Sequence, residues 1–197
     1  NRRYPVAWLD ANWPSHDGSL EDILQRKPDL VLAGEYNALL LRGRLQTLGI
    51  RVEVLPLPQT LLQVQAYQQQ VLQLLGQPST LIEQLPAPVI PSGPRQRLLL
   101  LGANGIGTGR DTLESQLIEH AGWSNYLRHT GHADLALEQI INDPPDAIVW
   151  VAPSSHALAN QFAQHPALKR AIASERWLAT EDWRWQCPGP WMWQLIG

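Results

Sequence analysis

The chain has 197 residues, 44% of them hydrophobic, which is enough to bury one large core or two of roughly 100 residues each. It carries 15 Lys and Arg against 18 Asp and Glu, and a formal net charge of -3 argues against a nucleic-acid-binding protein, which usually shows a basic stripe. No apolar run reaches the roughly 18 residues of a membrane span, and the single cysteine, Cys187, excludes an intramolecular disulfide.

The first part of the chain predicts alternating helices and strands. Ser19 suits a helix N-cap and Pro28 a helix stop, while the apolar run that follows is typical of a buried parallel strand. Ile50, Val52 and Val54 alternate with polar residues and predict a half-buried strand near a sheet edge. The expected elements are a helix over 19–25, a strand over 29–34, a helix over 37–48, a strand over 50–55 and a helix over 60–75.

A proline-rich stretch over 77–96 then predicts a linker with one short helix at most, and the alternation restarts after it. Asp111 and Glu114 have the spacing of a capping box. The expected elements are a strand over 97–101, a glycine-rich turn over 102–109, helices over 112–121 and 134–142, a strand over 147–152, helices over 156–164 and 166–173, a strand over 177–180 and a final helix from Pro190. This order predicts an α/β fold of two Rossmann-like lobes with parallel sheets, an N-terminal lobe over 1–76 and a C-terminal lobe over 97–197 joined by the linker.

One phrase occurs twice in the chain. L-E-D-I-L-Q-R-K-P-D-L-V-L at 20–32 and L-E-Q-I-I-N-D-P-P-D-A-I-V at 137–149 share Leu, Glu, Ile, Pro and Asp at identical spacing. Each copy predicts a short helix, a proline-terminated turn and a buried strand. A generic αβ turn is the alternative, but it would not explain the shared glutamate. Because helical residues are about 100° apart, Glu21 and Glu138 should turn away from the apolar face and form two equivalent exposed carboxylates.

These residues resemble a known family. S-L-E-D-I-L-Q-R-K-P-D-L-V-L-A-G at 19–34 and L-A-L-E-Q-I-I-N-D-P-P-D-A-I-V-W at 135–150 resemble the two lobe signatures of class III periplasmic binding proteins, which serve importers of siderophores, haem and vitamin B12. The run from Leu98 to Asn125 resembles the start of their C-lobe. L-A-N-Q-F-A-Q-H-P-A-L at 158–168 and W-Q-C-P-G-P at 185–190 fit a proteobacterial branch for iron complexes or cobalamin.

The resemblance implies a non-enzymatic component of an ABC importer. Such a protein would hold a ferric siderophore, cobalamin or haem in a cleft between its lobes, use no resident cofactor, and deliver the ligand to a permease and through it to the ATPase. In the family one glutamate per lobe docks onto permease arginines, and by motif match these are Glu21 and Glu138. A periplasmic location is also implied, although the sequence shows no signal peptide. The family's first strand and helix are absent, so the N-terminal lobe is expected to lack its first elements.

Ligands of parallel α/β lobes lie at the carboxyl ends of the strands, so we expect the ligand-binding residues in the loops that follow the strands. Tryptophan offers a broad face with one N–H, and the chain has nine. Trp183 also resembles a ligand-side tryptophan of vitamin B12-binding relatives, while a plain structural role stays open for every candidate. The candidate ligand-binding residues are Trp13, Glu35, Tyr36, Arg110, Trp183 and Trp185.

A nucleotide-binding enzyme is the alternative function. G-A-N-G-I-G-T-G, from Gly102 to Gly109, resembles a dinucleotide-binding loop between a strand and a helix. Such folds also need an acidic residue at the end of the next strand, where this chain has Ala152 and Pro153. Metal and nucleophile hypotheses are weaker, because His129 and His132 lack a nearby third ligand and Cys187 lacks an evident base.

Overall fold

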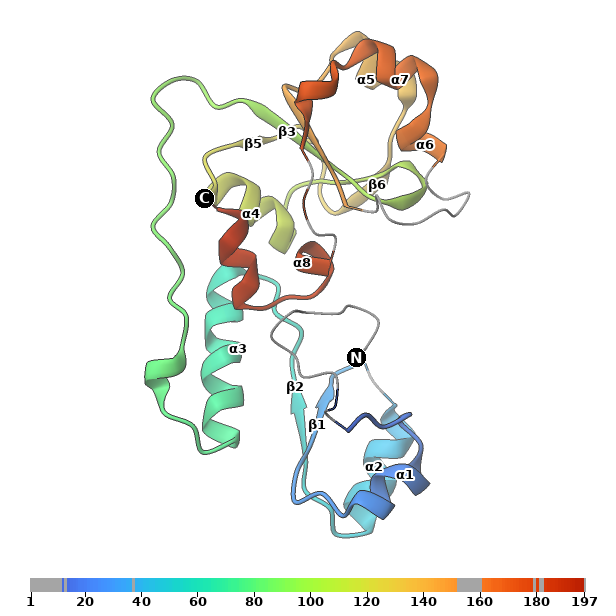
Figure 1. The fold of residues 1–197 in the computed structure, drawn as a ribbon, viewed down its shortest axis with the longest axis vertical. Helices are drawn as coiled ribbons and strands as arrows, with labels where there is room; N and C mark the ends of the chain where they lie inside the picture. The colour runs from blue at the N-terminus through green and yellow to red at the C-terminus, as the bar shows by residue number, and fades with distance from the viewer. Residues whose placement is uncertain are drawn as a thin grey trace. The chain divides into compact units, whose positions relative to one another are not determined.

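The computed structural model describes residues 12, 14–36, 38–151, 161–178, 180 and 183–196. The chain divides into two compact units, Asn1–Leu57 and Pro58–Gly197, each described by itself below (Figure 1). Within the described residues, no helix is both long and apolar enough to cross a membrane.

The first unit contains a two-stranded parallel sheet formed by β1 (Val31–Gly34) and β2 (Val52–Leu55). Helix α1 (Leu20–Arg26) precedes β1, and helix α2 (Leu39–Thr47) connects the two strands. These elements confirm the predicted order.

The alternation of Val52 and Val54 with polar residues does not mark the buried face of β2. Leu55 is the buried residue of this strand, whereas Val54 is exposed. Alternation shows which residues share a face of a strand, but only the packing partners decide which face is buried.

The second unit is built on a mixed sheet in the order β6–β4–β3–β7–β8. Its three parallel strands are β3 (Arg97–Leu101), β7 (Ala147–Trp150) and β8 (Trp177–Leu178). Strands β4 (Ile106–Thr108) and β6 (His132–Asp134) run antiparallel, and β5 (Ser124–Asn125) adds a short parallel pairing to β3. A wholly parallel sheet was predicted, which is wrong here because the glycine-rich turn folds back as a hairpin.

Most predicted helices of this unit are present, with shifted ends. Residues 132–134 form β6, so the helix expected from residue 134 begins only at Leu137. The N-cap of α4 is Thr112 rather than Asp111, because the Thr112 hydroxyl accepts the Ser115 N–H at 3.1 Å. The helices are α3 (Leu61–Leu74), α4 (Leu113–His120), α5 (Leu137–Asn142), α6 (Gln161–Gln164), α7 (Pro166–Ala171), α8 (Trp183–Gln186), and the 3-10 turns η1 (Ser79–Leu81), η2 (Ala103–Gly105), η4 (Ser174–Arg176) and η5 (Pro190–Leu195).

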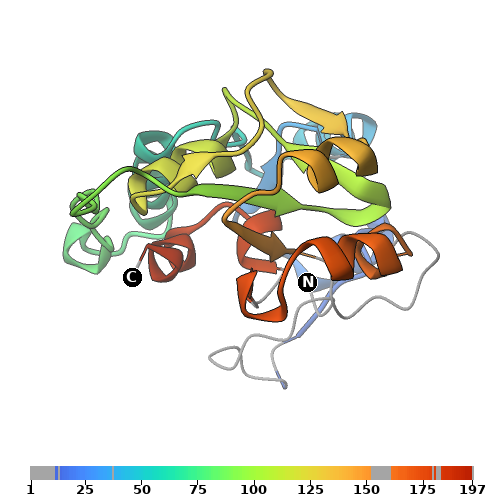
Figure 2. The ribbon, with the colours of Figure 1, turned by 90° about the horizontal axis from the view of Figure 1, so that it is seen from above.

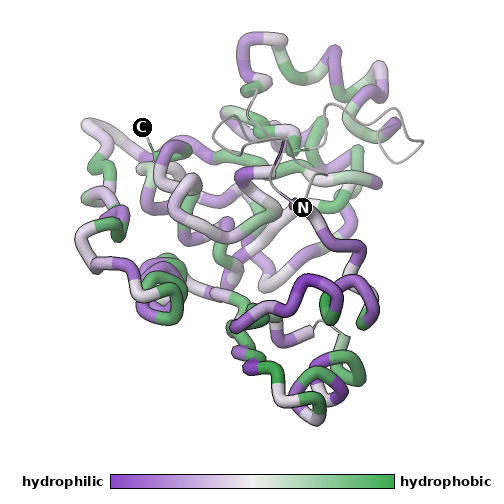
Figure 3. The backbone as a smooth tube through the Cα atoms, turned by 60° about the horizontal axis from the view of Figure 1, so that its bottom comes forward, coloured by the Kyte–Doolittle hydropathy of each residue, from purple (hydrophilic) through white to green (hydrophobic). Residues whose placement is uncertain are grey.

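Strand β3 lies in the middle of the second unit and is buried on both faces (Figure 2). Leu98 and Leu100 pack in one core cluster with residues of α3, α4 and η5. Leu99 and Leu101 pack in the other with residues of α5 and α7, which lie side by side (Figure 1). Figure 3 shows hydrophilic and hydrophobic residues alternating along the coiled parts of the chain, as expected of helices buried on one side only.

The proline-rich stretch over 77–96 contains the single short turn η1, as predicted, and is fastened to the second unit. The Val89 N–H donates to the His120 carbonyl at 2.8 Å, and the Trp193 indole N–H donates to the Glu83 carbonyl at 3.2 Å. Helix α3 packs against α4 and η5 in the same unit. The lobe boundary expected at residue 76 stays a prediction.

Candidate functional site

The two copies of the repeated phrase form the same local structure. In each, a short helix with one buried isoleucine is followed by a proline turn and a strand, α1–β1 in the first unit and α5–β7 in the second. Ile23 is 7% exposed and Ile140 is 0% exposed. Glu21 and Glu138 lie in the first turns of these helices and are both exposed, as the helical phase predicted.

Two candidate ligand residues lie together after β1. The Glu35 carboxylate accepts the Leu57 N–H at 3.0 Å and so connects the ends of β1 and β2. Hydrogen bonds from Tyr36 and then Leu57 lower the pKa of Glu35, and the bond to Glu35 raises the pKa of the Tyr36 phenol. Tyr36 is 80% exposed, so its ring is accessible to a ligand. Trp13 lies outside the described residues.

The two tryptophan candidates lie on α8, and their environments differ. Trp185 is only 6% exposed, and its indole N–H donates to the Thr180 hydroxyl at 2.6 Å. The Trp183 ring is tilted against that of Trp191, with centroids 5.5 Å apart, and the Arg184 guanidinium lies 4.9 Å from the Trp183 centroid. Trp183 is half-buried, so part of its face can meet a ligand.

Arg110 is exposed and lies on the turn that follows β4. Its backbone N–H donates to the His129 carbonyl and its carbonyl accepts the Gly131 N–H, both at 2.8 Å. These bonds tie the turn to the loop before β6 and leave the guanidinium on the surface.

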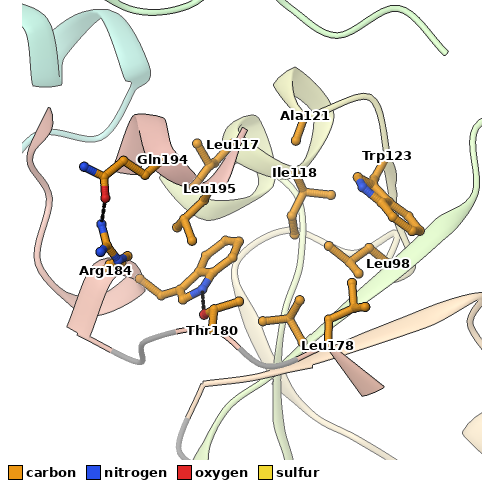
Figure 4. A pocket seen from close by; sticks show the side chains of 12 residues that line it. Leu98, Leu117, Ile118, Ala121, Trp123, Leu178, Thr180, Arg184, Gln194 and Leu195 are labelled. Carbon is orange, nitrogen blue, oxygen red and sulfur yellow. Dashed lines mark hydrogen bonds between the residues drawn. The ribbon is translucent and has the colours of Figure 1, made fainter. Parts of the chain in front are cut away.

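A cavity of about 620 Å³ lies between the sheet and the helices α4, α8 and η5 (Figure 4). Its volume is within the range of about 300 to 1,000 Å³ found for ligand pockets. Trp123 and Trp185 supply aromatic walls, and Figure 4 shows Arg184 directed toward Gln194 at one end, where the two side chains are hydrogen-bonded. The other lining residues are Leu98, Leu117, Ile118, Ala121, Val149, Leu178, Thr180 and Leu195.

Trp185, a candidate from the sequence, lines this cavity together with Trp123, which was not a candidate. The candidates were chosen mainly from loops at the carboxyl ends of strands, whereas Trp123 follows helix α4. The high tryptophan content was the only signal available for it.

The glycine-rich turn does not have the geometry of a dinucleotide loop. Strand β3 is followed by the hairpin strand β4, and α4 begins only at Leu113. The Gly102 N–H donates to the Ile106 carbonyl at 2.8 Å and the Gly109 N–H to the Gly131 carbonyl at 2.7 Å, so these amides already have partners. A Cβ on Gly107 would lie 2.4 Å from Leu127 Cδ1. The glycines therefore permit close packing within the protein rather than the approach of a phosphate.

Metal-binding chemistry is not indicated in the part of the chain that the structure describes. No group of three or more His, Cys, Asp or Glu side chains is placed there to hold a metal ion.

Comparison with known proteins identifies the fold. No family model and no curated protein matches the chain. The structure is similar to a possible iron-binding (periplasmic solute-binding) protein from Staphylococcus epidermidis, with 18% identity, a TM-score of 0.70, and 90% of this chain and 78% of that chain covered. It is also similar to the periplasmic haem-binding protein HutB of Vibrio cholerae, with 19% identity, a TM-score of 0.69, and 90% and 77% covered. The chain has the fold of class III periplasmic binding proteins.

The periplasmic vitamin B12-binding protein BtuF of Vibrio cholerae shares this periplasmic binding-protein fold. It has 18% identity, a TM-score of 0.54, and 90% of this chain and 74% of that chain covered. The resemblance expected from the two signature phrases is thus confirmed at the level of the fold. Both signature phrases form the helix–turn–strand units that the sequence predicted, one in each unit of the chain.

Proposed function

We propose that this chain is the substrate-binding component of an ABC importer. In the periplasm it captures a ferric siderophore, haem or cobalamin, and it then delivers this ligand to the permease. The proposal rests chiefly on the paired signature units, each of which presents one exposed glutamate from the first turn of a helix anchored by a buried isoleucine. Two such carboxylates on two units suit two-point docking onto cationic residues of a permease.

The ligand class follows from two further observations. Proteins with the same fold are named for iron, haem and vitamin B12, that is, for a metal or a metal complex. The chain offers half-buried and exposed aromatic rings, including Tyr36, Trp123 and Trp183, and these suit a large planar ligand. On this proposal the chain acts by binding and release, without catalysis.

Tryptophan fluorescence tests the ligand proposal. Haemin, cyanocobalamin and a ferric catecholate siderophore are each titrated into the protein, with free tryptophan amide as the control for light absorption by the ligand. Saturable quenching by one of them, at a stoichiometry of one ligand per chain, supports the proposal. If none of the three quenches beyond the control and NADH binds instead, the chain is a nucleotide-binding protein and the proposal fails.

Substitution of the two glutamates tests the docking proposal. Exposed ion pairs contribute about 0.2 to 1 kcal/mol each, so Glu21→Ala and Glu138→Ala should each weaken association with the permease about 1.5- to 5-fold. Ligand affinity should stay at the wild-type value. Glu119→Ala is the matched control, because Glu119 is also an exposed helical glutamate but lies outside the repeated phrases. A loss of ligand binding in either glutamate variant would contradict a docking role.

A further inference from the structure

Arg97 makes an unusual set of contacts with the turn that follows helix α5. Its Nη1 donates to Asp143 Oδ2 at 2.8 Å and its Nη2 to the Pro144 carbonyl at 2.9 Å. Its backbone N–H donates to Asp146 Oδ2 at 2.7 Å, and its carbonyl accepts the Asp146 N–H at 2.9 Å. One residue at the start of β3 therefore holds three of the four residues between α5 and β7.

Tyr126 completes this arrangement from the other side. Its hydroxyl donates to the Asp143 carbonyl at 2.9 Å, and the Arg97 guanidinium carbon lies 5.5 Å from its ring centroid. The hydrogen bond from Arg97 lowers the pKa of Asp143 and raises that of Arg97 in return. We call Arg97, Tyr126 and Asp143 the clamp.

Helix α5 needs an external restraint because it is short and poorly capped. It has six residues, and its N-cap, Ala136, makes no side-chain cap hydrogen bond. Helices far shorter than about 12 residues are not stable by themselves. Its position therefore depends on its packing, by Ile140 in the core and against α7, and on the clamp at its carboxyl end.

The first copy of the phrase is restrained in a different way. Helix α1 is held near its amino end, where the Ser19 hydroxyl accepts the Asp22 N–H at 3.2 Å and the Arg26 side chain reaches Asp22 at 2.8 Å and the Ser15 carbonyl at 2.8 Å. The clamp is thus a feature of the second copy, and it restrains α5 at the end opposite to the uncapped amino end.

We propose that Arg97 is a positioning residue for permease docking, which fixes the turn after α5 and thereby the direction in which Glu138 is presented. The inference rests on the proposed function, since Glu138 matters in this way only if it docks. A hollow of about 360 Å³, lined in part by Arg97, Arg128 and Gln139, lies beside the clamp. A methionine at position 97 is smaller than the arginine and therefore does not overpack this region.

The test compares Arg97→Met with Arg97→Lys and with the control Arg51→Met, which breaks an exposed pair with Glu53 in the first unit. Lysine keeps a charge near Asp143 but cannot form the two-pronged contact with Asp143 and Pro144. Hydrogen exchange of the α5 amides and association with the host's permease–ATPase complex in lipid nanodiscs are measured. Arg97→Met should accelerate exchange of the Ile140 and Asp143 amides about tenfold, Arg97→Lys less, and the control not at all.

A double-variant cycle separates positioning from general stability. Arg97→Met should weaken permease association about as much as Glu138→Ala, yet have no further effect in a chain that already carries Glu138→Ala. If Arg97→Met weakens permease association equally with and without Glu138→Ala, or leaves exchange of the α5 amides unchanged, the positioning role of Arg97 is wrong. The docking proposal is not affected by that result. If Glu138→Ala itself leaves association unchanged, the docking proposal fails and the positioning role fails with it. Asp143→Ala removes the carboxylate that Arg97 binds and serves as the second variant if Arg97→Met does not fold.

Discussion

Gly109 ends the glycine-rich turn at a point with no space for a side chain. A Cβ there would lie 2.2 Å from the His129 carbonyl oxygen and 2.9 Å from that of Gly131. Both obstacles are backbone atoms, and both accept hydrogen bonds of 2.7 and 2.8 Å that join this turn to the loop before β6. Gly109→Ala must therefore displace one loop by roughly 1 Å and weaken one or two of these bonds.

The loss of unfolding free energy in Gly109→Ala can be estimated from the displaced loop and the weakened hydrogen bonds. Each backbone hydrogen bond contributes about 1 kcal/mol, and forced overpacking costs about 1 to 3 kcal/mol, so Gly109→Ala should destabilise the protein by about 2 to 4 kcal/mol. With a slope near 2 kcal/mol per molar, the urea midpoint should fall by about 1 to 2 M. Gly93→Ala is the control, since nothing lies within 4 Å of its added Cβ and alanine reduces the freedom of the unfolded chain. An unchanged or higher midpoint for Gly109→Ala would refute the packing role of this glycine.

Three further predictions concern the core and the clamp. Ile140→Ala should destabilise the second unit by about 2 to 5 kcal/mol in urea unfolding, because this side chain is fully buried. Asp143→Asn should lower the unfolding midpoint at pH 7, and this effect should shrink as the pH falls below 3.8, because a carboxyl whose pKa is lowered in the folded state stabilises the fold only while it is ionised. Trp193→Phe should destabilise the second unit by at least about 1 kcal/mol, because it removes part of a buried ring and the indole N–H that bonds the Glu83 carbonyl. It should also speed proteolysis of residues 77–96, and equal cleavage rates would contradict the contact between this stretch and the second unit.

The repeated phrase could be predicted well because its structure is determined over a few residues. Ser19 caps a helix, Pro28 and Pro145 stop one, and the helical phase alone separates a buried isoleucine from an exposed glutamate. The run over 97–101 was also predicted as a strand. Its four leucines give no sign of which face each belongs to, and only the packing of helices on both sides of the sheet divides them.

The ligand candidates were less predictable because their environments depend on distant residues. Trp185 was chosen as a ligand contact, and the structure gives its indole N–H a partner in Thr180 and places its ring against the core. Asp111 had the spacing of a cap, but its carboxylate accepts the Thr130 hydroxyl, and Thr112 caps the helix instead. Residue spacing along the chain cannot show either contact.

The sequence by itself determined the order of helices and strands in the first unit, the two signature units and the exposure of Glu21 and Glu138, since caps, proline stops and helical phase act within one or two turns of the chain. The tertiary structure alone decided that the glycine-rich turn is a hairpin, that the sheet is mixed, and that Arg97 holds the turn after α5. Arg97 and Asp143 are 46 residues apart, and Trp193 and Glu83 are 110 apart. Contacts over such separations exist only once the whole chain has packed.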